Sequence, residues 1–135
     1  MFIFDPMAVL EKLPHLRSLV LFNNVYEGKI VVCSARGFPE LQELELVFLT
    51  ELEEWRVEEG AMSSIKRVKL LSCWNMKMLP EGLQYMTTLK ELELIVMSNI
   101  KARILPENVG EDWYKIQHVP LIVIKDSYVR VPRRY

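Results

Sequence analysis

The chain has few of the residues on which most catalytic and metal sites depend. Its 135 residues include only two histidines, two cysteines and five glycines. The glycines form no GxxxxGK[ST] phosphate loop, and the sequence contains neither a GxSxG elbow nor an HExxH zinc motif. The cysteines form no CxxC pair, which favours a reducing, cytoplasmic compartment over a disulfide scaffold. We therefore expect no enzymatic activity, no metal ion and no cofactor.

The chain also lacks a strong charge of either sign and any long apolar run. It has 17 basic and 18 acidic residues, so no global field draws it to nucleic acid or to an anionic membrane. Apolar runs such as Leu121 to Ile124 are far shorter than the roughly 20 residues that a membrane helix needs. Half of the residues are nevertheless hydrophobic, which is enough for the core of one modest domain.

What the chain does contain is one spacing repeated four times. The pattern is LxxLxxLxLxx(N/C/L), with apolar residues at offsets 0, 3, 6 and 8. The copies are LPHLRSLVLFNN from Leu13, FPELQELELVFL from Phe38, MSSIKRVKLLSC from Met62 and MTTLKELELIVM from Met86. Successive copies are 24 or 25 residues apart, which is a period typical of leucine-rich repeats. The sequence therefore predicts an α/β repeat fold, a short right-handed leucine-rich-repeat solenoid with a concave parallel sheet.

Each LxLxx segment is predicted to be a short strand, stacked in register with its counterparts. Because side chains alternate across a strand, every second residue points into the solenoid and the others point outward. The predicted inward residues are Leu19, Leu21, Leu44, Leu46, Val68, Leu70, Leu92 and Leu94. After each strand the chain turns at Asn24, Leu49, Cys73 or Met97. Of these, only Asn24 has an amide for the turn; Cys73 has a weak thiol donor, and Leu49 and Met97 are expected to offer no hydrogen bond.

The convex side is predicted to be loop and short helix. The segment DPMAVLEKLP reads as a helix with Asp5 as N-cap and Pro6 in the first turn. LPEGLQYM, at 79–86, is a convex segment, and Ile30 to Cys33 is a candidate extra strand. ELEEWRVEEG is assigned to a convex loop. Two interpretations remain for it: Trp55 packs inward, or the glutamates contact a basic partner.

A final strand is predicted near the C-terminus in one of two registers. One register runs through Trp113, Ile116, Val119 and Leu121, and the other through Val119, Ile122 and Ile124. At the other end, the array is predicted to begin without a cap, which favours a fragment of a longer receptor. The predicted units are 1–12, an incomplete preceding repeat with its helix; 13–97, four repeats; 98–124, a connection and the final strand; and 125–135, a tail.

The outward strand positions form three columns across the predicted concave face. Two columns alternate in charge, and the third is apolar. An exposed apolar stripe with charges at its rim is typical of a protein-binding surface. The alternative is that a loop or the C-terminal tail of this chain covers the stripe. The candidate binding residues are Glu43, Arg67 and Glu91; Glu45, Lys69 and Glu93; Phe22, Val47, Leu71 and Ile95; and the adjacent Phe48 and Val96.

Several segments, taken in order, carry a resemblance to a known family. They are DPMAVLEKLPHLRSLVLF, GFPELQELEL, LEEWRVEEGAM, LPEGLQYMTTLKELEL and GEDWYKIQHVP, and they cover most of residues 5–120. The set resembles the C-terminal leucine-rich-repeat region of plant nucleotide-binding leucine-rich-repeat disease-resistance proteins of the coiled-coil type.

The resemblance implies a role in plant innate immunity. In that family the repeat region recognises a pathogen effector, directly or through a guarded host protein, and also contacts the nucleotide-binding domain to hold the receptor inactive. The nucleotide switch lies in that other domain, so nucleotide binding is not carried over to this chain. The alternatives are a general intracellular leucine-rich-repeat scaffold and a truncated remnant without independent function.

Overall fold

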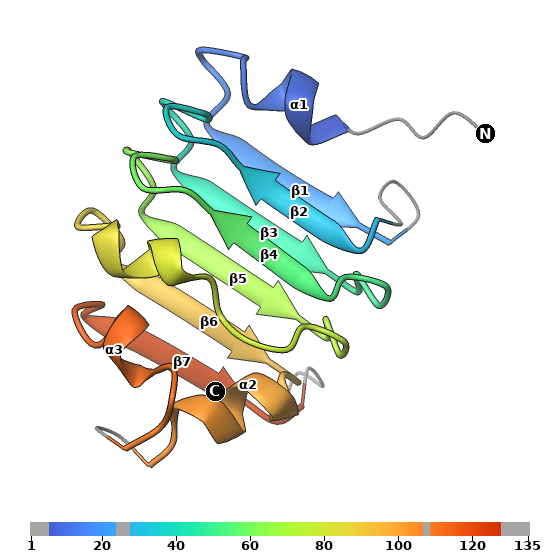
Figure 1. Cartoon of the computed structure of the whole chain (residues 1–135), viewed down its shortest axis with the longest axis vertical. Helices are drawn as coiled ribbons and strands as arrows, with labels where there is room; N and C mark the ends of the chain where they lie inside the picture. Colours follow the sequence, from blue (N-terminus) through green and yellow to red (C-terminus); the bar gives the residue numbers. More distant parts are fainter. Residues whose placement is uncertain (1–5, 24–27, 107–108, 128–135) are drawn as a thin grey trace, which may run out of the picture.

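A computed structural model describes the chain over residues 6–23, 28–106 and 109–127. Its main element is a five-stranded, all-parallel sheet to which each of the four repeats contributes one strand and the C-terminal part a fifth (Figure 1). In spatial order the strands are β1 (Ser18–Phe22), β3 (Glu43–Val47), β5 (Arg67–Leu71), β6 (Glu91–Ile95) and β7 (Leu121–Lys125). The predicted short leucine-rich-repeat solenoid is confirmed.

The strands pair in the register that the repeat spacing predicts. Leu46 of β3 lies between Leu21 of β1 and Leu70 of β5, and all three side chains are exposed by 3% or less. The residues that alternate with them point away from the core, to the side that we call the concave face. The leucine spacing thus turns one face of every strand inward, because side chains alternate with a period of two.

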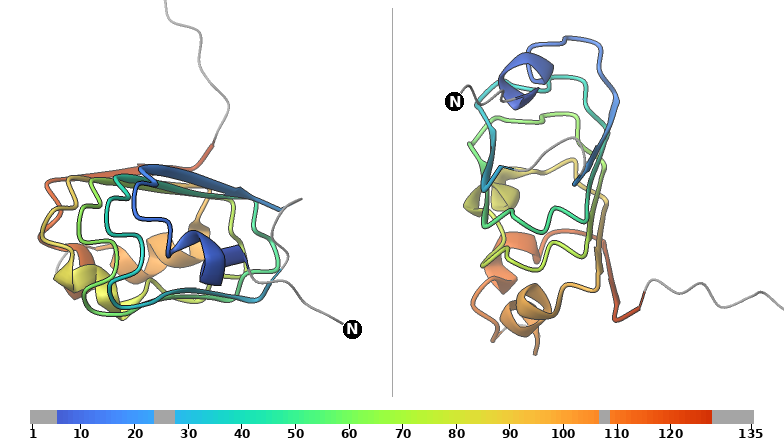
Figure 2. Two further views of the ribbon diagram at one scale, coloured as in Figure 1. Left: turned by 90° about the horizontal axis from the view of Figure 1, so that it is seen from above. Right: turned by 90° about the vertical axis from the view of Figure 1, so that its right-hand side faces the viewer.

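The opposite, convex side carries a second, smaller parallel sheet. β2 (Ile30–Cys33) pairs with β4 (Glu54–Val57), and Figure 2 shows this layer facing the five-stranded sheet across the core. The sequence predicts β2 but assigns β4 to a loop, which is wrong. Trp55 and Val57 are only 1% and 6% exposed, whereas the residues that alternate with them are exposed. The strand alternation is present in the sequence, but the glutamates around it hide it.

Short helical segments complete the convex side. They are α1 (Pro6–Leu10), the 3₁₀ helix η1 (Glu81–Tyr85), α2 (Ser98–Ile104) and α3 (Trp113–Ile116). α1 confirms the predicted N-terminal helix, while its predicted cap Asp5 lies outside the described residues. α2 and α3 lie within the C-terminal connection, where the repeat spacing predicts no helix. They cover the convex side beside β6 and β7 (Figure 1).

The final strand pairs in the second of the two predicted registers, the one through Val119, Ile122 and Ile124. β7 places Ile122 and Ile124 beside the inward leucines of β6. The other register, which turns Leu121 inward, is wrong, because that side chain is 49% exposed. The preceding Trp113–Ile116 segment forms α3 instead of the start of a repeat, so the connection is longer than in the other repeats.

The turns after β5 and β6 use sulfur where a leucine-rich repeat commonly has an amide. The thiol of Cys73 lies 3.5 Å from the carbonyl oxygen of Leu46, to which it donates. The backbone N–H of Cys73 donates to the Sδ atom of Met97 at 3.3 Å. The expectation that Met97 offers no hydrogen bond is therefore wrong. The predicted turn amide of Asn24 lies outside the described residues.

Three bulky or polar residues adopt a left-handed backbone directly after β3, β5 and β6. Phe48, Ser72 and Val96 have φ values of 53°, 50° and 52°. Their N–H groups nevertheless continue the ladder, donating to the next strand at 2.8–3.0 Å. A left-handed conformation is unfavourable for such side chains, above all for β-branched Val96. The sheet ladder and the tight turn together hold it in place.

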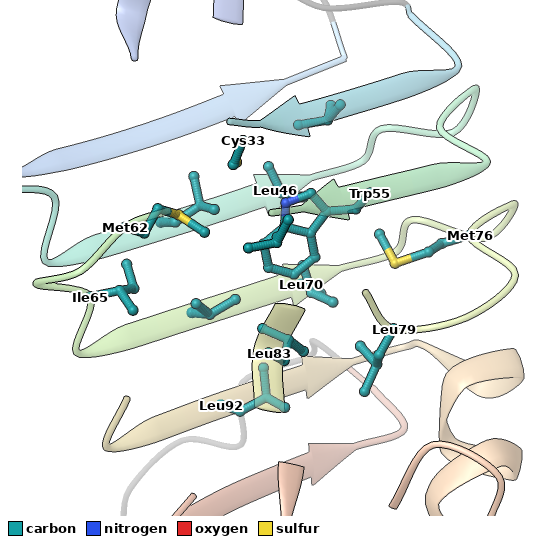
Figure 3. Packing of buried hydrophobic residues seen from close by; sticks show 14 of the residues in the cluster. Cys33, Leu46, Trp55, Met62, Ile65, Leu70, Met76, Leu79, Leu83 and Leu92 are labelled. Atoms are coloured by element: carbon teal, nitrogen blue, oxygen red, sulfur yellow. The ribbon is translucent and has the colours of Figure 1, made fainter. Parts of the chain in front are cut away.

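The core lies between the two layers of the solenoid. Figure 3 shows Trp55 from the convex side among Leu46 and Leu70 from the five-stranded sheet and Leu83 from η1. All four side chains are exposed by 1% or less. Each repeat therefore completes its neighbour's core, and no single repeat encloses these side chains alone.

A buried charged cluster joins the C-terminal connection to the convex side of the third repeat. The side chains of Asp112 and Lys115 are 1% and 2% exposed and lie 2.9 Å apart. The Asp112 carboxylate accepts from the N–H of Leu79 at 2.9 Å, and the Lys115 ammonium donates to the C=O of Leu79 at 2.7 Å. Arg103 adds two further hydrogen bonds to Asp112, at 3.0 and 3.1 Å. These side chains satisfy both backbone groups of Leu79, as an adjoining strand does within a sheet.

Candidate concave-face binding site

The candidate binding residues lie on the five-stranded sheet in the predicted columns. The first column consists of one residue from each of four successive strands, which pair in register: Ser18, Glu43, Arg67 and Glu91. The same register aligns the other two columns. These are Val20, Glu45, Lys69 and Glu93, and Phe22, Val47, Leu71 and Ile95.

The first column is a ladder of alternating charge. The guanidinium of Arg67 lies 3.6 Å from the carboxylate of Glu43 and 3.2 Å from that of Glu91. The hydrogen bond to Glu91 raises the pKa of Arg67 above its ordinary value. With Arg67 57% and Glu43 51% exposed, water screens their interaction. Such a pair contributes only about 0.2–1 kcal/mol to stability, so the ladder leaves its charges available to a partner.

The second column repeats the alternation one layer along the strands. Lys69 lies 3.6 Å from Glu45, and Glu93 stands on its other side in register. The two charged columns together line a shallow hollow of about 210 Å³. It contains four carboxylates and two cationic side chains, which leaves two negative charges in excess. The concave face can therefore receive basic side chains of a partner between its own charges.

The apolar column is less exposed than the sequence indicates. Phe22 is 47% exposed, but Val47 and Ile95 are only 7% and 5% exposed, and Leu71 is half-buried. Strands in a sheet lie about 4.8 Å apart, so residues of one column cover one another. Phe22 lies on the edge strand β1 and has a column neighbour on one side only. The expected continuous apolar stripe is thus reduced to the β1 end of the sheet.

The remaining candidates stand beside this column and are half-buried. Phe48 and Val96 occupy the left-handed positions that follow β3 and β6. On β1 itself, Val20 is 38% exposed and lies on the same face as Phe22. The accessible apolar surface of the concave face is therefore made mainly by Val20 and Phe22 at the β1 end and by Leu121 of β7, which aligns with Glu91 and is 49% exposed.

The described residues contain neither a candidate metal-binding cluster nor a candidate membrane-spanning helix. Within residues 6–23, 28–106 and 109–127, no group of three His, Cys, Asp or Glu side chains is placed to hold a metal ion. None of the described helices has the length and apolar character needed to cross a membrane.

The structure also shows a cluster that sequence reasoning missed. Asp112 and Lys115 stand three residues apart in the GEDWYK segment and are buried together against Leu79. Burial alone would raise the pKa of Asp112, but hydrogen bonds from Arg103, Leu79 and Lys115 outweigh it and hold that pKa below its usual value. The sequence signal for this buried pair was an acidic and a basic residue next to the apolar Trp113 and Ile116, because charged residues in an apolar setting are commonly paired.

Repeat strands at a period of 24 or 25 residues, with inward leucines on one side and charged ladders on the other, define a leucine-rich-repeat solenoid. Its relatives are plant disease resistance proteins. The chain is 45% identical over 116 residues to the disease resistance RPP8-like protein 3 of Arabidopsis thaliana, a match that covers 86% of this chain and 12% of that protein. It is also 45% identical over 117 residues to disease resistance protein RPP8 of Arabidopsis thaliana, covering 86% of this chain and 13% of the relative.

A third relative matches a slightly longer part of the chain. The probable disease resistance protein At1g58390 of Arabidopsis thaliana is 39% identical over 126 residues, which is 93% of this chain and 14% of that protein. The resemblance to plant disease resistance proteins is thereby confirmed, and the chain spans about an eighth of the length of these relatives. No family model matches the chain, and no solved structure matches it significantly.

Proposed function

We propose that this chain is a non-enzymatic protein-interaction module of plant innate immunity that binds its partner through the concave face. The partner is a pathogen effector, a guarded host protein or the nucleotide-binding domain of a receptor of this class, and binding takes place in the cytoplasm. The defence role rests on the disease resistance relatives. The cytoplasmic setting is supported by two cysteines that are buried and unpaired.

The concave face is proposed as the binding surface on the basis of one observation. Aligned charged columns stand beside the exposed Val20 and Phe22, so the concave face combines a charged hollow with an apolar border. The two excess carboxylates favour a partner that presents lysine or arginine to the hollow. An apolar side chain of the same partner covers Phe22. Interfaces typically combine a desolvated apolar contact with charge complementarity of this kind.

A charge reversal on the concave face tests the proposal. Binding of the purified chain to the purified nucleotide-binding domain of a disease resistance receptor is measured by microscale thermophoresis. Glu91→Lys removes a carboxylate from the hollow and is expected to weaken binding about tenfold, equivalent to about 1.4 kcal/mol. Leu71→Asp, in the centre of the apolar column, is expected to weaken it as well.

Glu59→Lys is the matched control, because it makes the same change of charge at an exposed position just after β4 on the convex side. We expect this variant to bind within twofold of the wild type. If Glu91→Lys and Leu71→Asp bind as tightly as the wild type while both remain folded, the concave face is not the contact surface.

A further inference from the structure

The five-stranded sheet ends in two edge strands, and no strand of the described residues pairs beyond either of them. β1 is the first strand in spatial order and β7 is the last, so they lie at opposite ends of the sheet (Figure 1). An edge strand presents a row of backbone N–H and C=O groups with which a further strand can pair. Each end of the sheet is therefore a candidate site for the addition of a strand.

The free backbone groups of β1 belong to its outward residues. Along a strand, the N–H and C=O groups of successive residues point alternately to the two sides. The C=O of Arg17 accepts from the N–H of Glu43 at the start of β3, at 3.1 Å. The backbone groups of Arg17 and of every second residue after it therefore point toward β3. Those of Ser18, Val20 and Phe22 point to the free edge.

The free backbone groups of β7 belong to its inward residues. The N–H of Leu121 donates back to the C=O of Lys90 at 3.1 Å, so Leu121 and every second residue after it face β6. The groups of Ile122 and Ile124 therefore point to the free edge. Inside the sheet, outward residues of one strand likewise pair with inward positions of the strand before it. The edge of β7 is thus the backbone complement of the edge of β1.

The outward side chains at the two ends match as well. The two charged columns carry glutamate, arginine and lysine on β3, β5 and β6, but they end in uncharged residues. These are Ser18 and Val20 on β1 and Leu121 and Val123 on β7. Val20 is 38% and Leu121 49% exposed. Pairing the two ends would cover apolar surface and would bring no like charges together in these columns.

The inward side chains show the same incompleteness. Leu44 and Leu92, which have a strand on each side, are 0% exposed. Leu19 of β1 and Ile122 and Ile124 of β7 pack against the same core but are only half-buried. Each of these side chains lacks the neighbour that a further strand supplies within the sheet. An apolar edge of this kind favours association with another strand.

We propose that a second copy of this chain docks head to tail, with β1 of one copy pairing in parallel with β7 of the other. Continuing the register of the sheet places Ile122 beside Leu19 and Val123 beside Val20. The contact repeats the step that relates neighbouring strands, so it does not close, and further copies can add at the free ends. The concave face stays open to a partner, and this inference does not rest on the proposed function.

Sedimentation velocity of the full chain, without any partner, tests the proposal. The average mass is expected to rise with protein concentration from the monomer to the dimer and beyond, because each added copy leaves one free edge at each end. A monomer at every concentration up to the solubility limit would overturn the proposal. Since no partner is present, this result is independent of binding by the concave face.

Two variants each block one edge. Val20→Lys modifies β1 and Val123→Lys modifies β7, and strand pairing places these positions beside Glu45 and Glu93. Each lysine therefore has an opposite charge next to it on its own sheet, and the fold should be retained. An edge lysine discourages strand addition. Each variant alone should self-associate at least about tenfold more weakly than the wild type, and wild-type association by either one would overturn the proposal.

An equimolar mixture of the two variants tests the direction of the contact. Val20→Lys keeps an unmodified β7 edge, and Val123→Lys keeps an unmodified β1 edge. The mixture therefore contains one intact pair of edges. It should form a dimer with the affinity of the wild-type contact and no larger species. A mixture that stays monomeric would overturn the head-to-tail contact.

Met78→Lys is the matched control. It makes the same change from an apolar to a cationic side chain at a position that is 46% exposed and lies on the convex side, away from both edges. Its self-association should stay within twofold of the wild type. If Met78→Lys weakens association as much as Val20→Lys does, the added charge and not the strand edge is responsible, and the proposal is overturned.

Discussion

The buried charged cluster gives the sharpest test of how the C-terminal connection is held. In the variant Asp112→Ala, the ammonium of Lys115 keeps a 2% exposed position but loses its partner at 2.9 Å. Its nearest remaining carboxylate is Glu81 at 3.6 Å, a side chain that is 64% exposed. The N–H of Leu79 also loses its acceptor. A single substitution thus leaves the buried ammonium with only the Leu79 carbonyl and the exposed Glu81 as partners, and leaves the N–H of Leu79 without an acceptor.

The expected magnitude follows from these losses. Removing one partner of a buried ion pair costs about 3–5 kcal/mol. An orphaned buried donor costs about 1–3 kcal/mol. The two terms overlap, because one relaxation can bring water to both groups. We therefore expect Asp112→Ala to lower the free energy of unfolding by about 4 kcal/mol, a large share of the roughly 5–15 kcal/mol typical of a domain.

Urea unfolding at pH 7, followed by tryptophan fluorescence, measures the change. The control is the double variant Asp112→Leu with Lys115→Met, which replaces the pair by apolar side chains of similar size. It leaves no buried charge alone, but both backbone groups of Leu79 lose their partners. We therefore expect it to lose a comparable or smaller amount of stability than Asp112→Ala. A loss below about 1 kcal/mol for Asp112→Ala, which is the range of an exposed ion pair, would refute the reasoning. So would a double variant that is less stable than the single one.

The same cluster predicts a dependence of stability on pH. The folded protein holds the pKa of Asp112 below its ordinary value of 3.8. A carboxyl whose pKa is lower in the folded state contributes stability above its unfolded pKa and loses it as pH falls. The difference between the wild type and the double variant should therefore be constant at neutral pH and shrink below about pH 3.8. A difference that shrinks between pH 7 and pH 5 would contradict this assignment.

Three further predictions concern the core and the thiols. Leu70→Ala, at a 0% exposed position, should lower stability by about 2–5 kcal/mol, and an unchanged melting curve would mean that the strand register is wrong. Gly82→Ala places a Cβ on the carbonyl oxygen of Val57 and should lower the melting temperature, whereas a melt equal to the wild type would show that η1 shifts freely. Burial raises the pKa of Cys33 to about 12 and that of Cys73 to about 11, so both thiols should resist alkylation at pH 8 until urea unfolds the chain; rapid labelling of the folded protein would contradict their burial.

Much of the sheet could be predicted from residue spacing because its contacts repeat. Each inward leucine meets its equivalent one period away, so the sequence distance alone sets Leu46 beside Leu21 and Leu70. The charge ladders follow from the same register, and Arg67 stands between two glutamates as predicted. The segment at Glu54–Val57 was missed because its alternation is short and lies among glutamates that read as a loop.

The limits of the prediction appear where the periodicity ends. The last strand had two acceptable registers by apolar spacing, and the pairing of Ile122 with Leu92 decides between them. The exposure of the apolar column could not be read from residue type. Val47 is covered by strands on both sides, whereas Phe22 has one neighbouring strand and remains exposed.

The sequence by itself determined the solenoid, the register of its first four strands, the inward leucines and the charged ladders. All of these depend on residues one period apart, and one period is visible in the chain as written. Only the tertiary structure decided that Asp112 and Lys115 take up the backbone groups of Leu79. The physical reason is that these backbone groups are left unpaired where the repeats stop matching, and their partners lie more than 30 residues away.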